Sequence, residues 1–204
     1  MSLLGGLFGC SQECDALVKA VVDNLADTVP LERLNKELQV LLGNVWLYGY
    51  AQKMWHCAQT PFGLSMLKLL SAGEVSMILM PIAKLIPALK VMTGQDDHGI
   101  EDVRKRVVKF EAEDLDRLAA AGCVCQHVTQ KPGEIVLIPP GWLCCEAATS
   151  GVLIYGIRRS FVTRGEASVQ DYSELIGSYS IAKKPMGKMK EILPFMKVDS
   201  DGEA

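Results

Sequence analysis

The sequence predicts an α+β protein in which N-terminal helices precede an antiparallel β-barrel or β-sandwich. Apolar residues follow a helical period over residues 14–45, whereas short apolar stretches separated by glycine and proline turns fill residues 123–161. We therefore divide the 204 residues into an N-terminal helical segment (1–57), a β-rich domain (58–165) and a C-terminal extension (166–204).

The N-terminal segment has the spacing of two amphipathic helices. Val18, Val22 and Leu25 recur every three or four residues, and Pro30 separates this helix from a second one with the same spacing. Large aromatic residues follow the second helix, and we expect them to pack in the core. They are Trp46, Tyr48, Tyr50 and Trp55.

The middle of the chain changes from strand to helix. Residues 75–80 form a short apolar run closed by Pro81, which predicts a buried strand. Residues 82–92 return to helical spacing. Residues 93–102 are rich in glycine and aspartate and predict an exposed loop, and residues 113–121 predict a short helix capped by the glycine that follows it.

Four strands are expected after this helix, each bounded by turn residues. We place them at residues 123–130, 134–138, 142–147 and 152–161, separated by Pro-Gly, Pro-Pro-Gly and Thr-Ser-Gly turns. Short strands joined by tight turns indicate an antiparallel barrel or sandwich.

Residues 133–144, which include the Pro-Pro-Gly turn, carry the most specific motif. Gly133, five residues, Pro139, one residue, Gly141, two residues and then Cys144 have the spacing of the second cupin motif, with cysteine at the position of its histidine. The segment resembles the cupin superfamily, and the Gly-Trp pair ending in Trp142 is typical of its Jumonji-type branch. That branch includes many iron- and 2-oxoglutarate-dependent oxygenases. The resemblance implies a degenerate double-stranded β-helix barrel.

The other half of the oxygenase metal site can be sought upstream. Thr60-Pro61 and Gly73-Glu74 match the frame in which these oxygenases carry a His-x-Asp pair, and Gly63 and Ser65 stand at the two ligand positions. With Cys144, all three ligand positions are then changed. The resemblance therefore implies a vestigial site without a metal or other cofactor.

We accordingly expect a non-catalytic binding or scaffold module. Jumonji-type proteins often dimerise through helices beside the barrel, so the resemblance implies a protein partner, a homo-oligomer or a subunit role in a larger assembly. Arg158 and Trp142 are candidate ligand-binding residues, since a basic residue in the barrel of such oxygenases binds the 2-oxoglutarate carboxylate. A small apolar or anionic molecule in the mouth of the barrel is a related hypothesis.

Two alternatives keep a metal. An oxygenase using Fe(II) and 2-oxoglutarate could have relocated ligands, drawn from His56, His98 or His127 with Glu101. A zinc site could instead use alternate residues of the strand 123–130. These are Cys123, Cys125 and His127, with Cys144 or Cys145 nearby.

The net charge and the cysteine usage limit the partners and the cellular compartments that we expect. The net charge of −3 argues against nucleic acid as the main partner. Seven cysteines occur without the spacing of a disulfide framework, which predicts reduced thiols. We therefore expect an intracellular compartment such as the cytoplasm or nucleus, with an organelle as the alternative.

Charged residues within 64–92 argue against a transmembrane segment. The basic, methionine-rich extension could contact a membrane surface.

Overall fold

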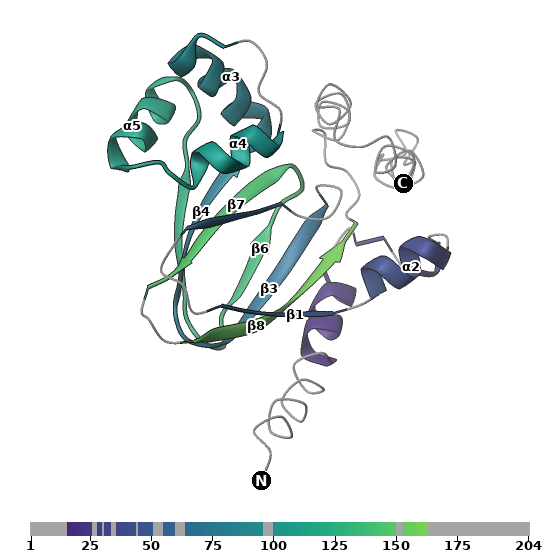
Figure 1. The fold of residues 1–204 in the computed structure, drawn as a ribbon. Coiled ribbons are helices and arrows are strands. Elements are labelled where there is room, and N and C mark those ends of the chain that lie inside the picture. Colours follow the sequence, from purple (N-terminus) through teal and green to yellow (C-terminus); the bar gives the residue numbers. More distant parts are fainter. Residues whose placement is uncertain are drawn as a thin grey trace.

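The computed structural model has an α+β fold in which two antiparallel sheets are accompanied by short helices (Figure 1). The structure describes residues 16–25, 28–29, 31–33, 36–43, 45–50, 55–59, 64–95, 100–149 and 153–162. The expected C-terminal extension and its membrane contact lie outside these residues.

The described elements follow one another in this order. A helix at 16–23 precedes the 3-10 turn η1 (Leu31–Arg33), α2 (Lys36–Gly43), β1 (Trp46–Tyr50), β2 (His56–Gln59), β3 (Ser65–Ala72), β4 (Val75–Pro81), α3 (Ile82–Thr93), α4 (Ile100–Val107), α5 (Ala112–Ala120), β5 (Gln126–Gln130), β6 (Ile135–Ile138), β7 (Trp142–Ala148) and β8 (Ile154–Phe161).

The strands form two four-stranded sheets with the orders β1-β8-β3-β6 and β2-β7-β4-β5. Every ladder is antiparallel. No ladder among the described strands joins the edge of one sheet to the edge of the other, so the expected barrel is found as two separate sheets. The edge strands are β1 and β6 in one sheet, and β2 and β5 in the other.

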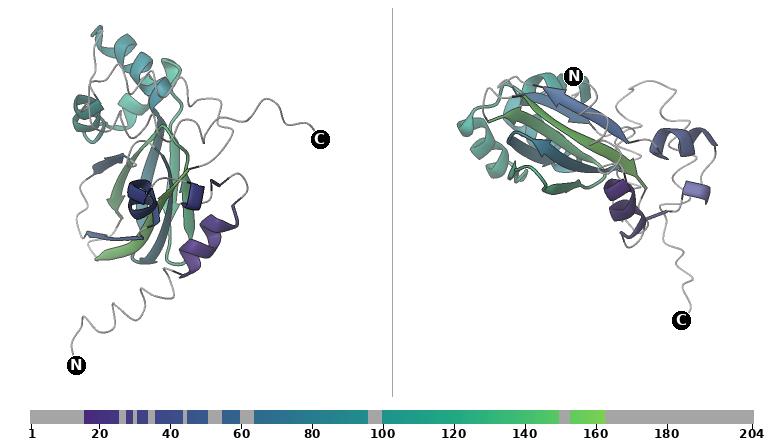
Figure 2. Two further views of the ribbon diagram at one scale, coloured as in Figure 1. Left: turned by 90° about the vertical axis from the view of Figure 1, so that its right-hand side faces the viewer. Right: turned by 90° about the horizontal axis from the view of Figure 1, so that it is seen from below.

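Alternation along the strands creates an interior and two outer faces. Met66 and Leu70 of β3 pack with Met77 of β4 and Ile138 of β6 between the sheets. The helix at 16–23 covers the outer face of β3 and β8, where its valines meet Leu67 and other apolar residues. Helices α3, α4 and α5 gather at the other end and cover the outer face of β4 and β7 (Figures 1 and 2).

The sequence predicted β4, α3, α5 and the last four strands, and these elements are confirmed with shifts of a few residues. Turn chemistry explains this success. Gly122, Gly133 and Gly141 all have positive φ, at the end of α5 and in the two turns on either side of β6.

Two expectations are wrong. Residues 46–50 form β1, although we expected a helical segment through residue 57; their alternating aromatic residues fit a pleated surface better than a helix. Residues 100–107 form α4, which begins inside the loop expected at 93–102, because two buried valines four residues apart, Val103 and Val107, attach this highly charged helix to the core.

None of the helices in the described part of the chain has the length and apolarity that crossing a membrane requires.

Candidate functional site

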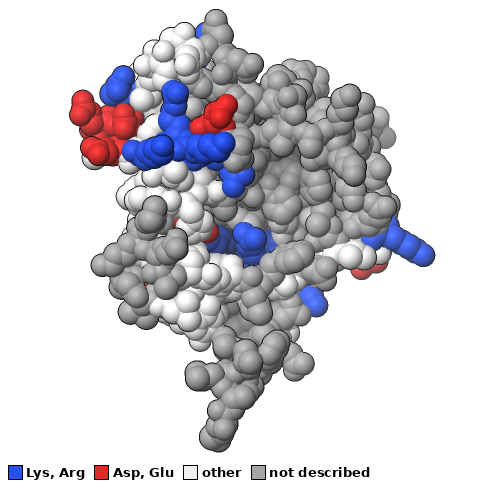
Figure 3. Space-filling model, in the orientation of Figure 1, with Lys and Arg blue, Asp and Glu red and all other residues white. Residues whose placement is uncertain are grey.

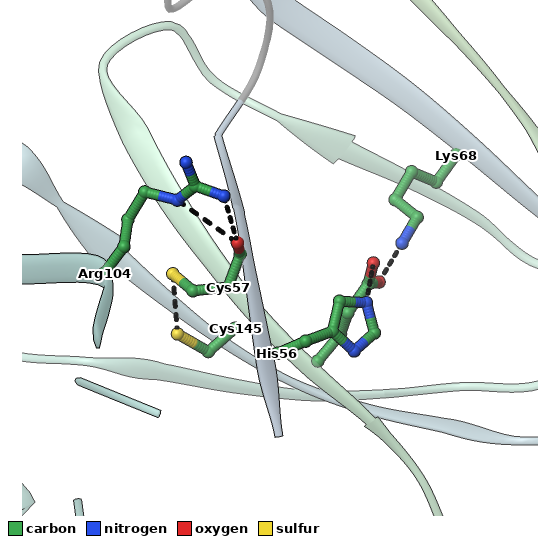
Figure 4. A network of polar contacts seen from close by, with 6 residues as sticks. His56, Cys57, Lys68, Arg104 and Cys145 are labelled. Atoms are coloured by element: carbon green, nitrogen blue, oxygen red, sulfur yellow. Dashed lines mark hydrogen bonds and ion pairs between the residues drawn. The ribbon is translucent and has the colours of Figure 1, made fainter. Parts of the chain in front are cut away.

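A buried carboxylate is the centre of the most polar cluster in the interior. Glu146 of β7 is 3% exposed. Its Oε1 lies 3.1 Å from Nε2 of His56, and its Oε2 accepts a hydrogen bond from Nζ of Lys68, which is 1% exposed (Figure 4). Glu146 therefore has a partner for each carboxylate oxygen, as a buried charge requires.

The strand registers explain why these three residues meet. His56 and Glu146 are directly opposite on the neighbouring strands β2 and β7. Lys68 belongs to the other sheet, where it alternates with Met66 and Leu70 and so points into the interior. The Lys68–Glu146 ion pair consequently connects the two sheets.

The two partners decide the ionisation of Glu146. Burial alone would raise the pKa of this carboxyl, because a low-dielectric interior disfavours charge. The hydrogen bond from His56 and the charge of Lys68 outweigh that effect and lower the pKa of Glu146 to about 2. The carboxylate is therefore ionised at neutral pH.

Two tyrosines line the same region. Lys68 Nζ lies 4.4 Å from the ring centroid of Tyr48, and the ring centroids of Tyr50 and His56 are 4.4 Å apart in an edge-on arrangement. Both tyrosine hydroxyls are buried; that of Tyr50 interacts with the Glu146 carboxylate, whereas that of Tyr48 has no hydrogen-bond partner among the described residues. Burial, followed by the charge of Glu146, raises the pKa of each phenol.

Three of the residues chosen from the sequence also face this interior. Trp142 and Cys144 alternate with Glu146 on the inner face of β7, where both pack against the interior cluster. Arg158 lies on the inner face of β8, close enough to Tyr48 for its charge to lower the phenol's raised pKa in part. Its neighbour Arg159 points outward and donates to the carbonyl of Leu42, at 3.3 Å.

The other half of the expected vestigial site is arranged differently. Gly63 lies outside the described residues. Ser65 is buried, but it alternates with Met66 and so belongs to the outer face of β3. Ser65 therefore points away from the interior that contains Cys144, and the two side chains do not face each other.

The proposed metal ligands do not gather into one site, although the thiols of Cys123 and Cys125 are hydrogen-bonded to each other. Cys123 is buried beneath the helices, Cys125 is partly exposed, and His127 is exposed on the edge strand β5. His98 and the side chain of Glu101 lie outside the described residues. The part of the chain that the structure describes contains no cluster of three histidine, cysteine or acidic side chains arranged for a metal ion.

The interior donors do not fit the iron of a Jumonji-type oxygenase, which needs two imidazoles and a carboxylate on one face. Burial, then the charge of Glu146, raises the pKa of Cys144 to about 12, so this thiol stays protonated. Lys68 already holds one oxygen of Glu146. Among the described residues, His56 is the one imidazole beside that carboxylate.

Sequence reasoning missed the roles of Lys68, Glu146 and the tyrosines. A usable signal exists, since Lys68 and Glu146 are single charges in otherwise apolar strands, at positions that alternate with core residues. What the sequence does not indicate is that these two charges face each other across 78 positions.

Comparison with protein-family models gives no match, and comparison with curated proteins gives none either.

The ionisation of Glu146 predicts acid sensitivity. A carboxyl whose pKa is lowered by folding adds stability above its unfolded pKa, near 4.5, and loses that contribution as pH falls toward 2. We expect the free energy of unfolding to fall over this window more steeply in the wild type than in Glu146→Gln. Urea titrations at several pH values would measure both slopes; equal slopes would contradict the lowered pKa.

Proposed function

We propose that this chain is a metal-free, non-catalytic member of the cupin and Jumonji-type superfamily that binds a small carboxylate in its interior. The observation that carries the proposal is a surplus of positive charge. Lys68 and Arg158 are directly opposite on β3 and β8 and point to the same side, whereas Glu146 is the carboxylate that neutralises Lys68.

The strand order supports the superfamily assignment. β1 pairs with β8, β2 with β7, β3 with β6 and β4 with β5, so the chain follows the path of one long antiparallel hairpin. Successive ladders of this hairpin alternate between the two sheets. This pairing order is the one that a double-stranded β-helix would have, so it supports the superfamily assignment that the Gly133–Cys144 motif led us to expect.

Unused donors favour an anionic ligand. No described residue forms an ion pair or hydrogen bond with the Arg158 guanidinium. The hydroxyl of Tyr48 is buried without a hydrogen-bond partner among the described residues, and a buried donor without an acceptor is costly. A carboxylate would supply acceptors to both groups, and guanidinium and carboxylate match each other as a bidentate pair.

The ligand would reach this region through the side that carries His56. The His56 side chain is 44% exposed although its ring contacts the buried Glu146. Arg158, Tyr48 and Trp142 are each only partly buried. Figure 3 shows blue side chains beside a little red in a hollow near the middle of the face, over the sheets. This position suits a small polar molecule.

A titration with small carboxylates tests the proposal. We expect 2-oxoglutarate or succinate to bind without added metal, and Arg158→Met to weaken binding about 10- to 100-fold, since a hydrogen bond to a charged group contributes roughly 1.5–3 kcal/mol. Calorimetry would measure both affinities. The matched control is Arg33→Met, which removes an exposed arginine of η1 and should leave the affinity unchanged.

Two results would contradict this proposal. Binding that Arg158→Met leaves unchanged would place the ligand elsewhere. Stoichiometric iron after purification, together with turnover of 2-oxoglutarate, would instead establish the oxygenase alternative.

The proposal also includes a scaffold role, in which the chain binds a protein partner or a second copy of itself. Light scattering, which gives the mass of the purified particle, tests this role.

A further inference from the structure

Two cysteines face each other on the outer side of the strand pair that carries His56 and Glu146. Cys57 of β2 and Cys145 of β7 are directly opposite in the antiparallel register, and their Sγ atoms are 3.0 Å apart. Figure 4 shows the two sulfurs pointing toward each other, on the side away from His56 and Lys68.

The spacing of the two strands already suits a disulfide between Cys57 and Cys145. Directly opposite residues of an antiparallel pair have Cα atoms about 4.5 or 5.5 Å apart, and disulfides span about 4.4–6.8 Å. The two sulfurs need to approach by only about 1 Å to reach the bond length of roughly 2.05 Å. Strand β2 is an edge strand, so a small shift toward β7 disturbs no other ladder.

We infer that Cys57 and Cys145 form a reversible disulfide when the protein meets a peroxide, and that this bond staples the edge strand β2 to its sheet. The inference does not depend on the proposed carboxylate site. A side chain of α4 already holds β2 at this point, since Nε and Nη2 of Arg104 donate to the carbonyl of Cys57 at 3.3 and 3.0 Å.

The surroundings assign different roles to the two sulfurs. Cys57 is 9% exposed and Cys145 is 1% exposed, so a small oxidant meets Cys57 first. Cys145 donates its S–H to Cys57 Sγ, and this hydrogen bond, followed by burial, raises the pKa of Cys145. Cys57 is therefore the attacking sulfur, and Cys145 is the thiol that resolves the intermediate.

The oxidation balances with hydrogen peroxide as the oxidant. Deprotonated Cys57 attacks one peroxide oxygen, the O–O bond breaks, and Cys57 sulfenic acid and hydroxide result. Cys145 then loses its proton, its sulfur attacks Cys57 Sγ, and the S–O bond breaks with release of a second hydroxide. The two released protons convert both hydroxides to water, so two thiols are oxidised while one peroxide is reduced to two waters.

Peptide mapping of the full-length protein tests this inference. After peroxide treatment and alkylation, we expect a Cys57–Cys145 cross-linked peptide that dithiothreitol removes. Cys57→Ser and Cys145→Ser should both lack it. Cys125→Ser is the matched control, because it removes a partly exposed cysteine beside Cys123 and should retain the cross-link. The inference would be overturned if Cys57 were linked to another cysteine. It would also be overturned if Cys57 and Cys145 stayed reduced while other cysteines were oxidised.

The staple itself has a separate readout. The bond would close a loop between residues 88 positions apart, so it should restrict the unfolded chain strongly. We expect oxidation to raise the Tm of the wild type by roughly 5–10 °C and to leave the Tm of Cys57→Ser unchanged. A cross-link that forms without raising the Tm would overturn the stapling role.

Discussion

Replacing Lys68 by methionine is expected to destabilise the fold by about 3–5 kcal/mol at neutral pH. Methionine keeps most of the side-chain volume, so the main loss is the charge that neutralises Glu146. That carboxylate is 3% exposed and would lose its lysine, while keeping its contacts with His56 and Tyr50. Urea unfolding monitored by tryptophan fluorescence would measure the change. Since a domain is typically stable by only about 5–15 kcal/mol, the variant should be close to unfolding.

The double variant Lys68→Met with Glu146→Leu is the matched control. Replacing a buried pair by apolar residues of similar size is often neutral, so we expect it to recover most of the lost stability. The single variant also has a distinct pH response. Without Lys68, the folded pKa of Glu146 is expected to lie closer to its unfolded value, so the variant should lose less stability than the wild type as pH falls toward 2. Wild-type stability in Lys68→Met at pH 7 would contradict the ion pair.

Gly156→Ala should be the second strongly destabilising substitution, at about 3 kcal/mol. A Cβ at this position of β8 would lie 2.4 Å from the carbonyl oxygen of Leu69 and 2.7 Å from the hydroxyl of Tyr48. The first neighbour is backbone within the adjacent strand β3, so it cannot move without breaking the ladder. Thermal unfolding and far-ultraviolet circular dichroism would measure the loss.

Gly49→Ala provides the comparison for this effect. Its Cβ would lie 3.1 Å from the carbonyl oxygen of Ile154, a contact that shifts of a few tenths of an ångström can relieve. We expect a loss of about 1 kcal/mol or less. Equal losses for the two alanine variants would show that the lack of a side chain at Gly156 is not needed to seat Tyr48 against β3.

Local patterns predicted much of this fold. Turn glycines such as Gly133 and Gly141 separate the last four strands and made them predictable. They did not give β1, because Trp46–Tyr50 follows a convincing helix and contains a glycine that weakens either assignment. The short helix α4 was not predicted either, since most of its residues are charged.

The candidate site was less accessible to sequence reasoning. Arg158 was a candidate ligand-binding residue, but alternation along β8 alone does not decide whether Arg158 or its neighbour Arg159 points inward. The outward contacts of Arg159 with Leu42 and Asp23 leave Arg158 inside. The Lys68–Glu146 pair depends on how one sheet lies over the other. Patterns within one strand carry no information on such a contact between sheets.

The strand order has a consequence for how the chain folds. No two described strands that pair are joined by a short turn, because even β4 and β5 are separated by the three helices α3, α4 and α5. No local β-hairpin can therefore form first, and each ladder requires distant segments to meet. Folding rates fall as the sequence separation of contacts grows. The helical insertion, whose contacts are local, is the natural place for early structure, and the sheets are expected to assemble slowly after it.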